Sequence, residues 1–136
     1  MRNGINVAPV EHYKENFVSK TAFQDSYPDE LSHCYGCGKN NNDGHQLKSY
    51  WHTHTTLDNE QVAEKTITHF TPQLCHTAIP GFVYGGLLAS LIDCHGTGSA
   101  AAMAYRKAQR PMGTRPALRF VTAALNVSYL APTPMG

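Results

Sequence analysis

The strongest periodic pattern in the chain predicts a long helix from Gly85 to about Lys107. One side of this helix carries an apolar stripe made of Leu87, Leu88, Leu91 and Ile92. Another side carries small residues, namely Ala89, Gly96, Gly98, Ala100, Ala101 and Ala102. A glycine inside a helix costs about 1 kcal/mol relative to alanine. The small residues therefore indicate that another backbone lies very close, as in a sheet wrapped around a central helix.

Shorter segments of aromatic, β-branched and alternating residues predict strands. Residues 47–55 and 62–70 form one predicted antiparallel pair, joined by a turn at 57–60. A long loop follows at 71–84, because Pro72, Pro80 and Gly81 interrupt any regular pattern. Residues 118–130 predict a third strand, on which Thr122 and Asn126 share one face.

The beginning of the chain has a different pattern. Apolar positions at loose helical spacing predict a helix at about 10–23, within an N-terminal helical extension that spans 1–33. Residues 34–45 are dense in Gly and Asn and predict a loop, with which the main domain, 34–136, begins. The order helix, strand, strand, long helix, strand predicts an α+β fold with an antiparallel sheet.

Composition limits the functional classes. The 136 residues fit a single domain, and a net charge of +1 gives no signature of nucleic-acid or membrane-surface binding. The first residues lack the apolar core of a secretory signal, and the apolar run Leu87–Ile92 is too short to span a bilayer. Four cysteines without a signal indicate reduced thiols. We therefore expect a cytoplasmic protein with no nucleic-acid or membrane partner.

The distribution of charge singles out Asp93. The first 93 residues contain ten acidic and six basic residues, whereas the last 43 contain five basic residues and no acid. Asp93 is the last acid and lies in the most apolar helix, where an ionised carboxylate is costly unless it has a use. A reactive carboxylate next to an anion-binding surface would explain the pattern. An ordinary helix acid followed by solvated arginines would explain it too.

Three segments together resemble one known family. Residues 34–38 are Cys-Tyr-Gly-Cys-Gly, and residues 80–86 are Pro-Gly-Phe-Val-Tyr-Gly-Gly, which run into the helix that carries Asp93. Residues 122–132 combine Thr122 with an Asn-x-x-Tyr sequence and a proline. This combination resembles the hotdog-fold acyl-CoA thioesterases, in the branch that has a Cys-x-x-Cys-Gly loop before the first strand.

The resemblance implies a hotdog fold, in which an antiparallel sheet wraps around a long central helix, and the hydrolysis of acyl-CoA to free acid and CoA. It implies that Asp93 acts as nucleophile or general base, and that Thr122 orients the water or holds the carboxylate. The backbone N–H of Gly85 or Gly86 would polarise the thioester carbonyl, as helix N-termini can. It further implies a homodimer or homotetramer with sites shared between subunits, and no cofactor. The basic second half then offers partners for the phosphates of CoA.

Two departures from the family's pattern leave an alternative open. The histidine that usually precedes the two glycines is Tyr84 here, which can bind substrate through a hydrogen bond but is a poor acid or base near neutral pH. The family also has further strands after the proline near residue 132, so we expect a C-terminally incomplete domain. A non-catalytic acyl-CoA-binding hotdog protein is the main alternative, and a dehydratase or hydratase acting on acyl thioesters is another.

Two further motifs have competing interpretations. Cys34 and Cys37, with His33 and His45 nearby, have zinc-ligand spacing, but no second cysteine pair follows, because Cys75 and Cys94 stand alone in the sequence. We expect free thiols in a tight glycine turn and assign no metal; a zinc- or redox-dependent interaction module is the alternative. Residues 96–101 match a Gly-x-Gly-x-x-Ala nucleotide fingerprint but lie inside the predicted helix, which excludes that function.

Overall fold

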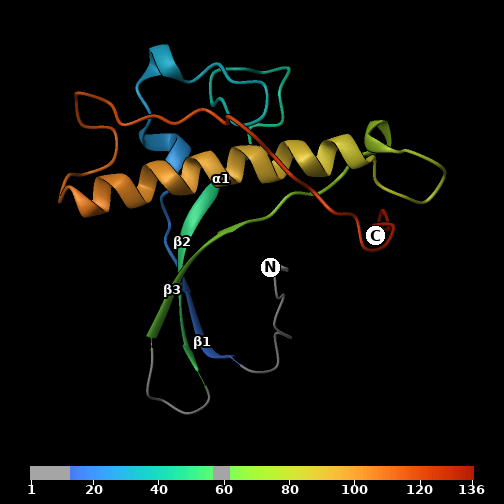
Figure 1. The fold of residues 1–136 in the computed structure, drawn as a ribbon, viewed down its shortest axis with the longest axis horizontal. Helices are drawn as coiled ribbons and strands as arrows, with labels where there is room; N and C mark the ends of the chain where they lie inside the picture. Colours follow the sequence, from blue (N-terminus) through green and yellow to red (C-terminus); the bar gives the residue numbers. More distant parts are fainter. Residues whose placement is uncertain (1–12, 57–61) are drawn as a thin grey trace.

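The computed structural model describes residues 13–56 and 62–136, and it has an α+β architecture (Figure 1). Three strands, β1 (Tyr13–Val18), β2 (Ser49–Thr56) and β3 (Val62–Thr68), form one antiparallel sheet in the order β1-β2-β3. One long helix, α1 (Gly85–Lys107), crosses it. Short 3-10 turns occur at η2 (Phe23–Ser26), η3 (Asp29–Leu31) and η4 (Leu74–His76). The predicted α+β class is confirmed.

The β2–β3 pair confirms the two strands predicted at 47–55 and 62–70. Their register runs from Ser49 opposite Thr68 to Thr55 opposite Val62. The turn predicted at 57–60 lies outside the described residues, as does the start of the helix predicted at 10–23.

The predicted helix at 10–23 is wrong for the residues that the structure describes. Residues 13–18 form β1, which pairs with β2 so that Phe17 lies opposite Thr53. The segment contains two aromatic residues and a valine, which favour strands, and an isolated short helix is marginal in water. Pairing with the available edge of β2 therefore outweighs a weak helical pattern.

Helix α1 confirms the long helix predicted from Gly85 to Lys107. It lies between the sheet and a layer of loops formed by residues 23–47 (Figure 1). Gly98 is buried, and a Cβ added there would lie 3.0 Å from the Gln24 amide nitrogen and 3.9 Å from the Ser49 hydroxyl. Gly98, one of the small residues of the helix, thus permits the close packing against a neighbouring segment that the sequence predicts. Gly96, by contrast, has no neighbour within 4 Å of such a Cβ.

The predicted loop at 34–45 is confirmed as a series of hydrogen-bonded turns. Gly38 N–H donates to the Cys34 carbonyl at 2.8 Å, and Leu47 N–H donates to the Gly36 carbonyl at 3.0 Å. The loop closes over α1, where Cys37, Leu47 and Cys94 form a buried cluster with Phe70 and Leu91 packed against it. A rigid loop therefore covers the middle of the helix.

The strand predicted at 118–130 does not form. Residues 118–135, which we call the strap, instead run extended along α1 in the opposite direction (Figure 1). The strap begins where Leu118 N–H donates to the Tyr105 hydroxyl at 2.9 Å, and it ends where Met135 N–H donates to the Gly81 carbonyl at 3.0 Å. Its residues favour an extended backbone, but no described strand lies beside it to supply a hydrogen-bonded ladder. No helix in the described residues is long and apolar enough to cross a membrane.

Candidate functional site

The strap brings Thr122 to Asp93. Asp93 lies on α1 and is half-buried, and the Thr122 hydroxyl donates a hydrogen bond to its Oδ1. The two residues are 29 positions apart, and each comes from one of the segments that the sequence analysis singled out. The second carboxylate oxygen of Asp93 receives no hydrogen bond from the described residues. The pair therefore presents an oriented carboxylate with one oxygen available.

The beginning of α1 brings Tyr84, Gly85 and Gly86 together. Tyr84 is the residue before the helix and has an extended backbone, and its carbonyl accepts the Leu87 N–H at 3.1 Å. Among the described residues, the N–H groups of Gly85 and Gly86 have no hydrogen-bond acceptor. They are two of the unpaired donors that every helix start presents. They could polarise a carbonyl oxygen that binds at the start of the helix.

Two tyrosines frame these unpaired donors. The Tyr84 ring is 57% exposed and lies against Gly86, at the position that a Cβ would fill. The Tyr129 hydroxyl, from the strap, donates to the Gly85 carbonyl at 2.7 Å, and its ring lies over Gly85. Tyr129 was not a predicted site residue, although it belongs to the Asn-x-x-Tyr sequence. The strap therefore contacts both Asp93 and the helix start.

Asp93 and the helix start are well separated within one chain. Seven or eight helical residues correspond to about 10–12 Å along the axis. A carbonyl oxygen bound to the Gly85 or Gly86 N–H would have its carbon only about 3–4 Å from the donor. The two groups of a single chain therefore cannot act on the same carbonyl.

The arginines of the basic second half are engaged within the chain. Arg106 pairs with Glu64 and Arg115 with Glu30, while Arg110 donates to the Thr114 carbonyl at 2.7 Å. Arg119 lies over the Tyr27 ring, 4.0 Å from its centroid. This arrangement differs from the open anion-binding surface that the charge pattern suggested.

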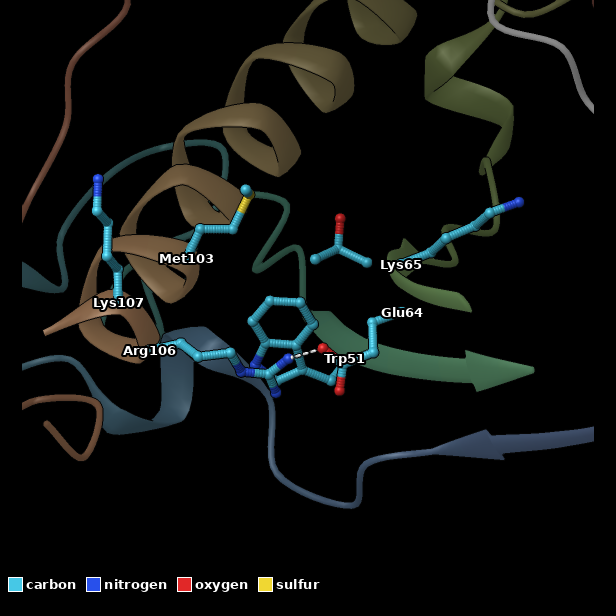
Figure 2. Close-up of a pocket in the computed structure, with 7 residues that line it drawn as sticks. Trp51, Glu64, Lys65, Met103, Arg106 and Lys107 are labelled. Atoms are coloured by element: carbon cyan, nitrogen blue, oxygen red, sulfur yellow. Dashed lines mark hydrogen bonds and ion pairs between the residues drawn. The ribbon is translucent and has the colours of Figure 1, made fainter. Parts of the chain in front are cut away.

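An open cleft of about 620 Å³ lies between the C-terminal end of α1 and the strands β2 and β3 (Figure 2). Figure 2 shows Arg106 stacked on Trp51, with its guanidinium carbon 3.5 Å from the ring centroid and its ion pair to Glu64 drawn. Met103 and Lys107 line the same cleft from the helix. Arg106 follows Asp93 by 13 residues, about 20 Å along the axis. The cleft is therefore separate from the Asp93 region.

A second cluster of reactive groups lies next to Asp93. The thiols of Cys34, Cys37 and Cys94 lie within 4.8 Å of one another, and the Cys34 and Cys94 sulfurs are 3.9 Å apart. Cys94 has no cysteine partner nearby in the sequence, but the fold brings it to the Cys-x-x-Cys loop. In the sequence, Cys94 is a single cysteine on the small-residue side of the predicted helix. Periodicity alone could not place it beside Cys34, which is 60 positions away. Cys75 is exposed and does not belong to this cluster.

The two buried thiols, Cys37 and Cys94, differ in proton affinity. Hydrogen bonding from Cys94 lowers the pKa of Cys37 to about 6, against the opposing effect of burial, and Cys34 and the Arg119 cation act in the same direction. Hydrogen bonding to the Cys37 sulfur and burial raise the pKa of Cys94. Of this pair, Cys37 therefore ionises before Cys94.

His95 belongs to a polar network between α1 and the sheet. Its Nδ1 lies 2.9 Å from the Ser49 hydroxyl, and its Nε2 lies 3.3 Å from the Thr66 hydroxyl. The Gln24 side chain bonds both the backbone and the hydroxyl of Ser49, which is fully buried. Burial lowers the pKa of His95. Because Ser49 is inaccessible, this serine–histidine contact serves to join elements and does not form a nucleophile.

Comparison with known protein families, with curated proteins and with solved structures found no match to this chain.

Proposed function

We propose that this protein is a hotdog-fold acyl-CoA thioesterase in which Asp93 is the nucleophile or general base. The observation that carries the proposal is the hydrogen bond from Thr122 to Asp93, which joins two of the segments whose combination resembles this family. The α+β architecture with one long helix is compatible with this fold. The unpaired N–H groups at the start of α1 supply the carbonyl-binding element that the chemistry needs.

Asp93 can catalyse thioester hydrolysis by either of two mechanisms. As a general base, Asp93 takes a proton from water while the water oxygen adds to the thioester carbon. As a nucleophile, its free oxygen forms a mixed anhydride that water then hydrolyses. In both routes the carbon–sulfur bond breaks, the acid is released, and the departing CoA thiolate takes up a proton. Thr122 holds the carboxylate in either role.

The separation of Asp93 from the helix start supports a site shared between two subunits. Since one chain cannot bring both groups to one carbonyl, a two-fold dimer would pair the helix start of one subunit with Asp93 of the other. Tyr84 then lies where the family has histidine, and its exposed phenol can donate a hydrogen bond to the substrate. Tyr84 is therefore proposed as a binding residue and not as the leaving-group acid.

The direct test is thiol release from a panel of acyl-CoA substrates that differ in chain length. We expect turnover by the wild type and a loss of at least about 100-fold in kcat for Asp93→Ala, the size typical of a lost general base. Ser90→Ala, on the same polar side of the helix, is the matched control and should retain activity. Equal rates for the wild type and Asp93→Ala would refute the assignment of Asp93.

A second function, acyl-CoA binding without hydrolysis, is favoured by Tyr84. A tyrosine at this position lacks a proton that can be transferred readily near neutral pH. Calorimetry of a non-hydrolysable acyl-CoA analogue, together with the turnover assay, separates the two functions. Tight binding without turnover on any chain length would select the binding protein.

A further inference from the structure

The cluster formed by Cys34, Cys37 and Cys94 has the dimensions of a metal site. A tetrahedral Zn²⁺ with Zn–S bonds of about 2.3 Å holds its sulfurs about 3.8 Å apart. The Cys34 and Cys94 sulfurs are 3.9 Å apart, and all three sulfurs lie within 4.8 Å of one another. Small side-chain rotations therefore suffice to bring the three sulfurs onto one ion.

The backbone around the cluster is built to hold these positions. The Cys-Tyr-Gly-Cys-Gly loop is fixed by its own hydrogen bonds, and a Cβ on Gly38 would collide with the Cys34 backbone. A Cβ on Gly36 would collide with the Cys94 sulfur. The two glycines therefore let the loop turn tightly and let the helix thiol enter it. The spacing of the first two cysteines is the Cys-x₂-Cys of structural zinc sites.

Charge and burial favour a bound cation. Cys37 and Cys94 are only 6% and 7% exposed, whereas Cys34 is exposed and gives access from solvent. Three thiolates and one Zn²⁺ carry a net charge of −1. Arg119 lies beside the cluster, and its buried Nη1 has no hydrogen-bond partner among the described residues. A guanidinium at this place can balance the remaining negative charge.

We propose that Cys34, Cys37 and Cys94 bind one Zn²⁺ as thiolates, with water in the fourth position. Binding releases the protons that the thiols still hold, so no oxidant or reductant takes part. The ion joins the loop to α1 next to Asp93, and so fixes the helix on which the carboxylate lies. The site does not depend on thioester hydrolysis.

The first experiment uses the wild-type protein, purified without oxygen in a phosphine reductant. We expect about one zinc per chain by elemental mass spectrometry, in keeping with a three-thiolate site. After chelation, titration with Co²⁺ should produce a thiolate-to-cobalt charge-transfer band that saturates at one equivalent. Adding Zn²⁺ should remove this band and raise the Tm of the apo protein, because the ion binds the folded state.

Variants identify the ligands. Cys34→Ser changes an exposed ligand in a loop, so it carries little risk to folding, and we expect it to weaken Co²⁺ binding by more than about 100-fold, beyond the usual effect of an outer-shell change. Cys94→Ser should lose binding as well. Cys75→Ser is the matched control and should bind like the wild type. Asp93→Ala should lose hydrolysis but keep the ion, which separates this proposal from the proposed function.

Several results would overturn the metal site. One is wild-type protein that retains no zinc and gives no charge-transfer band with excess Co²⁺. Another is unchanged Co²⁺ affinity in Cys34→Ser. A third is a Cys34–Cys94 disulfide that mass spectrometry still finds in protein purified without oxygen in the phosphine reductant. The two sulfurs would then be bonded to each other and unavailable to an ion.

Discussion

Asp93 lies in a less extreme environment than its place in an apolar helix suggested. It is half-buried, and the strap supplies a hydroxyl donor for one of its oxygens. A carboxylate held in this way keeps one oxygen free while its rotation is restricted. Orientation is what such a contact contributes to catalysis, and a displacement of about 1 Å can cost about 100-fold in rate.

This residue-scale view gives a prediction for Thr122. Thr122→Ser keeps the hydroxyl and should retain most of the thioesterase activity. Thr122→Val removes the donor at similar volume and should lower kcat by about 10- to 100-fold. Because the contact is exposed, Tm should change little in both variants. Equal kcat values for the two variants would show that Thr122 does not position Asp93.

His95 gives a second prediction, for the dependence of stability on pH. Burial lowers its pKa below the ordinary 6.5, so the folded state favours the neutral ring. The unfolded state binds more protons between the two pKa values, and stability is therefore lost as the pH falls below 6.5. Urea unfolding from about pH 7 to about pH 5 should show this loss, and His95→Gln should reduce it. His69→Gln, which replaces an exposed histidine, is the matched control.

At the scale of elements, Gly96 of α1 and Gly36 of the cysteine loop have opposite roles. Gly96 is exposed with open space around it, whereas Gly36 lies against the Cys94 side chain. Gly96→Ala should stabilise the protein by about 0.5–1 kcal/mol, since alanine is the better helix former. Gly36→Ala should destabilise it by about 1–3 kcal/mol through overpacking. Urea denaturation of the two variants measures both effects, and a neutral Gly36→Ala would mean that the loop does not fix the position of Cys94.

The sequence alone was sufficient to predict the elements that have a strong local pattern of hydrophobic, glycine or asparagine residues. Helix α1 and the β2–β3 pair follow from periodicity, and the loop at 34–45 follows from its glycines and asparagines. β1 and the strap could not be assigned correctly, because a strand depends on whether an edge is available, and sequence does not show the edge. The approach of Cys94 to the loop is equally non-local. Thr122 and Asp93 were paired only through the family resemblance.

At the scale of the whole molecule, the proposed site requires two chains, and this can be tested by complementation. Gly85→Pro removes one unpaired N–H at the first helical position, where proline is tolerated and where Tyr84 already has the extended backbone that proline favours. Asp93→Ala and Gly85→Pro should each be inactive alone. After mixing and re-association, half of the dimers contain one intact site of two, so about a quarter of wild-type activity should return.

The result of that experiment has a clear alternative. If mixing restores no activity while size-exclusion chromatography confirms mixed dimers, the two groups do not act at a shared site. Gly85→Ala keeps the N–H and should stay active, which controls for the added side-chain volume.

The strap has a consequence for how the site can change over time. Between residues 119 and 132, no backbone hydrogen bond among the described residues ties the strap to the rest of the chain; the attachment is through side chains such as Thr122 and Tyr129. Substitutions in the strap can therefore change the side chains that contact Asp93 and the helix start. They need not disturb the hydrogen bonds of the sheet or the buried residues beneath the strap. The fold and the proposed chemistry of this protein are thus largely separable, and selection can act on one while leaving the other unchanged.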